Sequence, residues 1–160
     1  MNKEIQVIGE FRDLLNKLIW LNKIKMEAQL KEYKSSEVHC IEFIGMHTDV
    51  NVTKLAETFY MTLGAISKLT KKLISKGIIE SYKKPENKKE IYFKLTEKGK
   101  TVYTIHEKLH NEFKERDKEV FEDVKDEELD IMINFAKKYG NHLDKELKKL
   151  GFDTKIRNYE

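Results

Sequence analysis

Hydrophobic positions recur every three or four residues in two short runs near the middle of the chain, which predicts two amphipathic helices. The first run comprises Val52, Leu55, Ala56 and Phe59, and the second comprises Ile66, Leu69, Leu73 and Ile74. Asn51 or Thr53 can cap the first helix and Thr62 the second, while Gly77 can end the second because glycine accepts the left-handed conformation. Two short helices joined by a tight connection predict a helix-turn-helix.

The pattern changes to β-branched and aromatic residues after Gly77, which predicts two strands over 78–83 and 90–95. The segment between them, KPENKK at 84–89, contains the only proline of the chain and favours a turn. Thr96 can cap a further helix after the second strand. Helix, turn, helix and a hairpin with a basic tip follow one another in the order of a winged helix-turn-helix.

Longer apolar stripes flank this centre on both sides and predict a mostly α-helical fold with one small β-hairpin. The stripes cover 3–33, 37–47, 102–124 and 129–150. Ser35 or Ser36 can cap the second of these helices. Acidic residues at Asp126 and Glu127 separate the last two stripes.

We therefore expect three parts: an N-terminal dimerisation helix at 1–34, a winged helix-turn-helix at 35–97, and C-terminal dimerisation helices at 98–160. The long stripes exceed what one small domain can bury, so packing across a two-fold axis in a homodimer is the simplest solution. The alternative is a monomer whose long helices fold onto its own centre.

The composition limits the class of protein. At 160 residues, with 39% hydrophobic and 37% charged residues, the chain can form a core beneath a strongly solvated surface. It has no run of about 18 apolar residues that could span a membrane and no signal-peptide pattern. Its single cysteine, Cys40, excludes an intramolecular disulfide and suits a reducing compartment. We therefore expect a cytoplasmic protein with no membrane partner.

Lysines are concentrated in the predicted winged part. Between Lys54 and Lys94 there are ten lysines and four glutamates, a local net charge of +6, whereas the whole chain carries only +3. Duplex DNA attracts proteins through local release of counterions, so this concentration predicts DNA binding. A helix with small residues at its start and lysines on one face can enter a major groove. The predicted DNA-binding residues are Thr53, Thr62, Gly64, Ser67, Lys68, Lys71, Lys72, Lys84, Asn87, Lys88 and Lys89.

The stretch from 51 to 100 resembles the MarR family of bacterial transcriptional regulators. The resemblance rests on the leucine–alanine pair Leu55 and Ala56, the small polar start of the second helix, the stop at Lys76 and Gly77, and the motif LTEKG at 95–99. It implies an obligate homodimer that binds a pseudo-palindromic operator with one recognition helix in each half-site. It also implies repression, in response to a small ligand or a metal.

The wing departs from the family pattern, which usually has an Asp-x-Arg tip whose arginine enters the minor groove. The matching residues here are Asn87 and Lys89, and lysine lacks the planar fork of arginine. No arginine occurs between Asn51 and Thr96, which removes the commonest bidentate contact to guanine. An A·T-rich operator read partly through its shape is therefore expected.

His106 and His110 are four residues apart, on one face of the helix after the wing, and His39 and Cys40 are adjacent on an earlier helix. Imidazole and thiolate are ligands that zinc prefers. The family resemblance implies the same chemistry, because a zinc-sensing branch takes ligands from these two helices; Glu27 is the candidate acidic ligand from the first helix. The sequence requires no cofactor, and Zn²⁺ is the one candidate. The competing explanation is an ordinary solvated surface with two histidines.

Two other effectors are open. Cys40 could sense oxidants, although a lone cysteine in an apolar helix is usually an inert core residue. An organic ligand could bind between the dimer helices and the DNA-binding part against Trp20, Tyr33 and Phe43, which core packing explains equally well.

Two other functions compete with DNA-binding regulation. A metal-dependent enzyme is disfavoured because the chain has no Gly-rich phosphate loop, no Gly-x-Ser-x-Gly elbow and no His-Glu-x-x-His motif. A winged-helix module for protein contacts is the nearer alternative, but it would not need a lysine-rich recognition helix.

Overall fold

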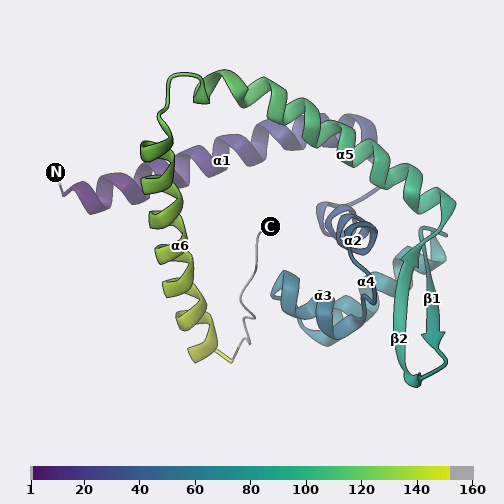
Figure 1. The fold of residues 1–160 in the computed structure, drawn as a ribbon. Helices are drawn as coiled ribbons and strands as arrows, with labels where there is room; N and C mark the ends of the chain where they lie inside the picture. Colours follow the sequence, from purple (N-terminus) through teal and green to yellow (C-terminus); the bar gives the residue numbers. More distant parts are fainter. Residues whose placement is uncertain (1, 152–160) are drawn as a thin grey trace.

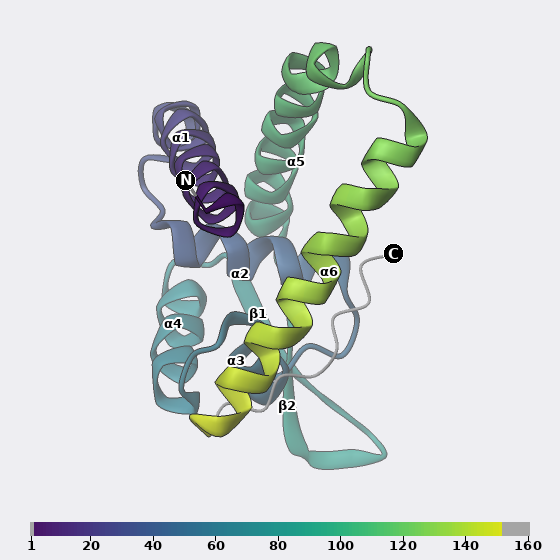
Figure 2. The ribbon, with the colours of Figure 1, turned by 90° about the vertical axis from the view of Figure 1, so that its left-hand side faces the viewer.

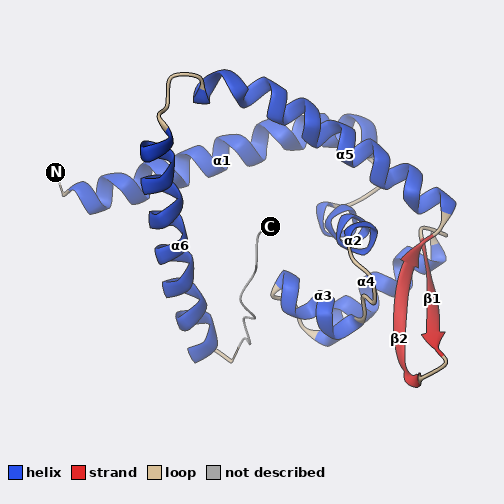
Figure 3. Cartoon of the chain, viewed as in Figure 1, coloured by secondary structure: helices blue, strands red, loops and turns tan. Residues whose placement is uncertain are grey.

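The structure, a computed structural model that describes residues 2–151, is mainly helical with one antiparallel hairpin, as the sequence predicts (Figures 1 and 3). The described elements are α1 (Lys3–Leu30), α2 (Ser35–Met46), α3 (Val52–Phe59), α4 (Leu63–Ser75), β1 (Ile79–Lys84), β2 (Asn87–Leu95), α5 (Glu97–Asp117), the 3₁₀ turn η1 (Lys118–Phe121) and α6 (Asp126–Lys149). The predicted parts 1–34 and 98–160 extend to residues 1 and 152–160, which lie outside the described residues.

Side-chain caps fix the ends of the helix-turn-helix where the sequence places them. Asn51 accepts a hydrogen bond from the backbone N–H of Lys54 at the start of α3, and Thr62 accepts one from Ala65 at the start of α4. Tyr60, with φ +53°, ends α3 in the left-handed region, and Gly77, with φ +69°, follows the end of α4. These groups satisfy backbone atoms that each helix end leaves without partners.

The wing is a longer hairpin with a tighter turn than predicted. β1 and β2 pair from Ile79 with Leu95 to Lys84 with Asn87, so only Pro85 and Glu86 form the turn. A single bridge joins Val50 to Phe93, whose N–H donates to the Val50 carbonyl at 2.8 Å. The hairpin is thereby attached to the loop before α3.

Side chains from α2, α3, α4, α5 and the hairpin pack together and form one hydrophobic core. Its fully buried members include Ile41, Leu55, Ile66, Leu73, Ile78 and Leu109. Two positions differ from the stripes predicted over α4 and over 102–124. Ile74 is exposed on α4, and Val120 is exposed because η1 replaces the continuation of α5.

The helix α2 begins earlier than predicted, and neither Ser35 nor Ser36 caps it. Both serines lie in its first turn, while Lys34 is the N-cap residue. The Glu37 carboxylate accepts a hydrogen bond from the Lys34 backbone N–H at 2.8 Å, as in the acidic half of a capping box.

The start of α5 approaches the loop after α4 very closely at Gly99. The Ile78 carbonyl already accepts the Thr96 N–H at 3.0 Å, and a Cβ at position 99 would lie 2.1 Å from the same oxygen. Only glycine fits here, which accounts for the glycine of the LTEKG motif in terms of packing.

We expect Gly99→Ala to lower the free energy of unfolding by about 2 kcal/mol, because backbone must move to admit the methyl group. Gly64→Ala is the matched control, since a Cβ there meets nothing within 4 Å and alanine favours a helix by up to about 1 kcal/mol. Urea unfolding of both variants at one protein concentration measures the difference. Equal stability of the two variants would contradict the proposed close approach.

The long helices form an arm that extends away from the winged part. α1 and α5 lie side by side above α2, and α6 turns back from the far end of α5 (Figures 1 and 2). Arg116 donates to Asn22 at 3.1 Å, and Phe11 of α1 stacks on Phe135 of α6 with ring centroids 5.9 Å apart.

Large hydrophobic side chains on this arm are exposed in the single chain. They include Ile5, Phe11, Leu15, Ile19 and Trp20 of α1, and Ile131, Met132, Phe135, Tyr139 and Leu143 of α6. The monomer alternative, in which these helices cover their stripes against the chain's own centre, does not describe the arrangement of residues 2–151. Among these residues, no helix combines the length and apolar character that crossing a bilayer requires.

Candidate nucleic-acid interface

The helix α4 buries one face and presents the opposite face to solvent. Ile66 and Leu73 are completely buried and attach the helix to the core, whereas Lys68 and Lys71 are exposed on the outer face. Among the residues that the structure describes, neither lysine has an ion-pair partner, so both ammonium groups are available to phosphates. The exposed Thr62 and Gly64 lie at the N-terminal end, and a Cβ on Gly64 would meet open space.

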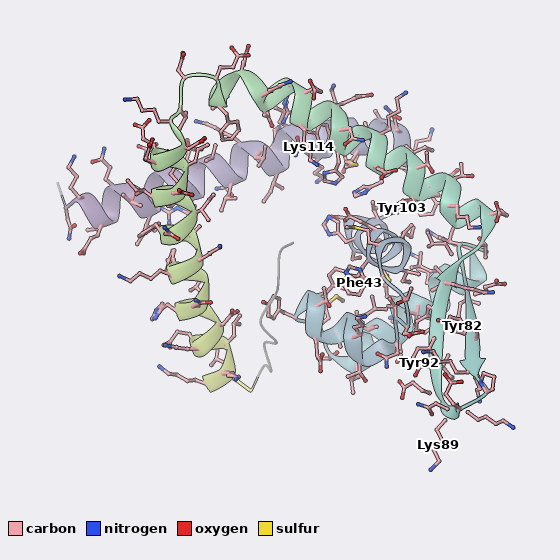
Figure 4. The ribbon with its side chains drawn as sticks, in the orientation of Figure 1. Phe43, Tyr82, Lys89, Tyr92, Tyr103 and Lys114 are labelled. Atoms are coloured by element: carbon pink, nitrogen blue, oxygen red, sulfur yellow. The ribbon has the colours of Figure 1, made fainter. Side chains whose placement is uncertain are left out.

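The tip of the wing carries a second group of exposed polar residues. Asn87, Lys88 and Lys89 are exposed, and Figure 4 shows Lys89 pointing outward from the tip. The Asn87 side chain accepts a hydrogen bond from the Glu90 N–H at 3.3 Å, which orders this end of β2. As at Lys68 and Lys71, no described residue forms an ion pair with Lys88 or Lys89.

An interaction network holds the wing to the loop before α3. The Lys84 ammonium lies 2.6 Å from the Asp49 carboxylate and 4.9 Å from the centre of the Tyr92 ring. Its hydrogen bond lowers the pKa of Asp49. The Tyr82 hydroxyl also donates to Asp49, at 3.3 Å. Lys84, predicted to bind DNA, is therefore engaged in orienting the wing.

A second contact orients the wing from its other strand. The Asn51 side-chain amide donates to Glu90 at 2.8 Å while its carbonyl caps α3. One asparagine thus links the first helix of the helix-turn-helix to β2.

Lys72 is also already engaged within the chain. Its ammonium lies 2.8 Å from the carboxylate of Glu37, which Lys76 contacts at 3.1 Å. Four of the predicted DNA-binding lysines lie on α4 or at the end of β1. The structure leaves Lys68 and Lys71 available and pairs Lys72 and Lys84 with carboxylates. Thr53, in the first turn of α3, is exposed, and Ser67 is half-buried beside Lys68.

Of the predicted metal ligands, His106 and His110 of α5 lie together, and Glu42 of α2, which was not predicted, lies beside them. Each of these three residues offers one ligand atom, and the three atoms lie within 4.8 Å of one another. The His106 and His110 Nε2 atoms are 3.0 Å apart. Two ligands about 2.0 Å from a tetrahedral zinc ion would be about 3.3 Å apart, so the histidine pair fits such an ion.

The protonation state of His106 suits a metal ligand. Burial, with contributions from His110 and His39, lowers the pKa of His106 to about 4, so the ring is neutral near pH 7. A neutral imidazole is the form that binds metals.

Cys40 and His39 do not join this group. The Cys40 side chain is fully buried in the core, and burial raises the pKa of its thiol to about 12, which disfavours the thiolate that zinc binds. His39 is exposed on α2, outside the three-residue cluster, and Glu27 is paired with Lys23 on the surface of α1. Of the four predicted ligands, the structure brings His106 and His110 together beside Glu42 and leaves His39 and Cys40 outside this cluster.

A cleft of about 510 Å³ opens beside the histidine pair, between α1, the end of α5 and η1, against Leu18, Asn22, His110, Phe113 and Phe121. Trp20, Tyr33 and Phe43, predicted to line an organic-ligand pocket, are not among its lining residues. Tyr33 and Phe43 pack against the core and Trp20 is exposed on α1.

Sequence reasoning missed the acidic partners Glu37, Asp49 and Glu90. Each is one carboxylate among many in a highly charged chain, and its partner lies far away in the sequence. The one local signal was Glu37 at the third position of a helix, where a capping carboxylate is favoured.

Comparison with known proteins agrees with this geometry. The model of the MarR family matches residues 34–91. The HTH-type transcriptional regulator PchR of Bacillus subtilis is 28% identical over 148 residues, which cover 84% of this chain and 88% of PchR. The uncharacterised HTH-type transcriptional regulator YvnA of the same organism is 32% identical over 139 residues, covering 81% of this chain and 88% of YvnA. The structure of Streptococcus pneumoniae FabT in complex with DNA has a similar fold, with a TM-score of 0.74 and 22% identity over 88% of this chain and 98% of FabT.

Proposed function

The chain belongs to the MarR family of DNA-binding transcriptional regulators, and on this premise we propose that it is a homodimeric repressor that places one α4 in each half of a pseudo-palindromic operator. The observation that carries the proposal is the pair of unpaired lysines on α4, Lys68 and Lys71, beside the basic tip of the wing. A protein-interaction module would not need cations kept free on this face.

The two basic groups have different roles in the proposed complex. Lys68 and Lys71 contact phosphates beside the major groove, while Lys88 and Lys89 reach the neighbouring backbone or minor groove from the wing. The proposed contact residues are Thr53, Thr62, Gly64, Ser67, Lys68, Lys71, Asn87, Lys88 and Lys89. Lysines in place of arginines favour an A·T-rich operator whose shape contributes to recognition.

The exposed apolar faces of α1 and α6 supply the proposed dimer interface. A partner copy would remove side chains such as Leu15, Ile19 and Met132 from water, and each fully buried side chain of this kind contributes about 1.5–3 kcal/mol. Residues 1–34 and 98–160 are thus the proposed dimerisation parts and 35–97 the DNA-binding part. Because operator DNA is its proposed target, we propose that the protein acts in the cytoplasm.

Selection of duplexes from a randomised pool tests this function. We expect enrichment of A·T-rich sequences with two-fold symmetry. Analytical ultracentrifugation of the complex should show two protein chains bound to one selected duplex. Enrichment of no sequence, or a complex with one chain, would contradict the proposal.

We further propose that Zn²⁺ is the effector and that Glu42, His106 and His110 hold it. The support is that these side chains from α2 and α5 converge on one point and that His106 is buried and neutral. When bound, the ion would join α2 to α5 and so bias the distance between the two recognition helices. Its role in this proposal is regulatory, and we propose no catalytic step for it.

We expect metal-free protein to bind one Zn²⁺ per chain by calorimetry, and His110→Ala to lose this binding. Cys40→Ala is the discriminating control and should bind zinc as the wild type does. With Co²⁺ as probe, the wild-type spectrum should lack the thiolate-to-cobalt charge-transfer band. Zinc uptake that depends on Cys40, or no uptake at all, would contradict this ligand set.

A further inference from the structure

A buried carboxylate joins α2 to the C-terminal end of the recognition helix α4. The Glu37 side chain is 1% exposed, and its two oxygens accept hydrogen bonds from the ammonium groups of Lys72 and Lys76. The same carboxylate accepts the backbone N–H of Lys34 at 2.8 Å. One side chain therefore caps α2 and binds two successive turns of α4.

Glu37 remains charged in this position. Burial alone would raise its pKa, but the hydrogen bonds from Lys72, the Lys34 N–H and Lys76 have the larger combined effect and lower it. The arrangement also matches the helix dipoles, since the carboxylate lies in the first turn of α2 and both lysines lie near the end of α4.

Lys76 extends this attachment to the loop between α1 and α2. Its ammonium donates to the Glu32 carbonyl at 3.0 Å and lies 4.9 Å from the centre of the Tyr33 ring. The N-terminal end of α4, with Thr62, Leu63 and Gly64, is by contrast exposed. The helix is thus held at the end opposite to the one that would approach the bases.

We propose that Glu37 is a positioning residue that sets the direction of α4 in the major groove and so contributes to discrimination among DNA sequences without contacting DNA. The inference rests on the DNA-binding function proposed above. Ile66 and Leu73 keep α4 in the core, but apolar contacts are non-directional, whereas hydrogen bonds from two turns of the helix to one fixed carboxylate restrict its rotation and tilt.

The arrangement has a consequence for charge. The carboxylate of Glu37 offsets the positive charge of Lys72 and Lys76, so it lowers the electrostatic attraction of α4 for DNA of any sequence. At the same time it holds α4 in the orientation that recognises one sequence. Replacing Glu37 by glutamine removes the negative charge that offsets these two ammonium groups. Affinity for the selected duplex should therefore fall while affinity for random DNA does not, a combination that a general loss of folding cannot produce.

The test compares Glu37→Gln with the wild type on two probes, the duplex that the wild type selects from a random pool and a duplex of scrambled sequence. We expect affinity for the selected duplex to fall by about ten-fold to a hundred-fold, the effect of one mismatched base pair in a site. Affinity for the scrambled duplex should be unchanged or higher. Glu80→Gln is the matched control: it removes the same charge from an exposed position in the wing, where Glu80 pairs with Lys94.

A loss of affinity by the same factor on both probes, or a Glu80→Gln result equal to that of Glu37→Gln, would overturn the inference. Lys72→Met provides a second route should Glu37→Gln not fold. It should lower the preference for the selected duplex while leaving the salt dependence of binding unchanged. A decrease of that slope would show that Lys72 contacts phosphate and would overturn the inference. Failure of the wild type to bind any duplex would contradict the proposed function, whereas wild-type binding with an unchanged preference in the variants would contradict this inference alone.

Discussion

The double variant Lys68→Ala, Lys71→Ala should lose DNA affinity by about a thousand-fold near 0.15 M salt. In a dimer the substitutions remove four ammonium groups, and each phosphate contact contributes about 0.9 to the slope of log affinity against log salt concentration. The slope should therefore decrease in magnitude by about three to four. Fluorescence anisotropy of a labelled duplex at several salt concentrations measures both quantities.

The double variant Lys108→Ala, Lys114→Ala is the matched control for this experiment. It removes the same number of charges from exposed positions on α5, and Figure 4 shows Lys114 far from the wing tip marked by Lys89. This control should keep nearly the wild-type slope. Equal slopes for the two double variants would mean that the protein's general charge, and not the outer face of α4, binds DNA.

Stability should depend on pH through His106, by about 3 kcal/mol in metal-free protein. Its pKa is about 4 in the folded chain, against an ordinary value of 6.5. Above pH 6.5 both states are neutral at this site and the stability is fully present. As pH falls from about 6.5 to about 4 the unfolded chain takes up a proton that the folded chain does not, so stability is lost over this range at about 1.4 kcal/mol per pH unit.

His106→Gln should lack this part of the pH dependence, while other acid-sensitive groups affect both proteins equally. Urea unfolding at fixed protein concentration, with a chelator present, gives the difference between wild type and variant at each pH. His142→Gln, which changes an exposed histidine of α6, is the control and should follow the wild type. Parallel curves for wild type and His106→Gln between pH 7 and pH 4 would contradict the buried, neutral state of His106.

Those parts of the fold that depend on neighbours in sequence could be predicted. Caps at Asn51, Thr62 and Thr96 and the stop at Gly77 are local backbone chemistry, and all four are confirmed. The exposed lysines on α4 follow from helical periodicity once the buried stripe is assigned. The mostly helical winged fold follows from the order of these local signals and is confirmed by the structure and by the family comparison.

Contacts between residues distant in sequence could not be predicted. Glu37 and Lys76 are 39 residues apart, as are Asn51 and Glu90, and nothing in a single sequence indicates which carboxylate meets which lysine or amide. The sequence therefore places Lys72 and Lys84 among the DNA-binding lysines, whereas the structure pairs them with Glu37 and Asp49. Whether Cys40 or Glu42 of α2 lies beside the histidines of α5 depends on how α2 is rotated against the core. The sequence alone does not show this rotation, and the structure places Glu42 there.

In the proposed complex, two copies of the chain hold two α4 helices at a fixed separation and bind one duplex. The most direct test is the affinity for the selected palindrome before and after insertion of about five base pairs, half a helical turn, at its centre. The insertion moves the half-sites to opposite sides of the duplex, so we predict that two-chain binding falls to the level of scrambled DNA. Undiminished two-chain binding to the lengthened site would contradict the account.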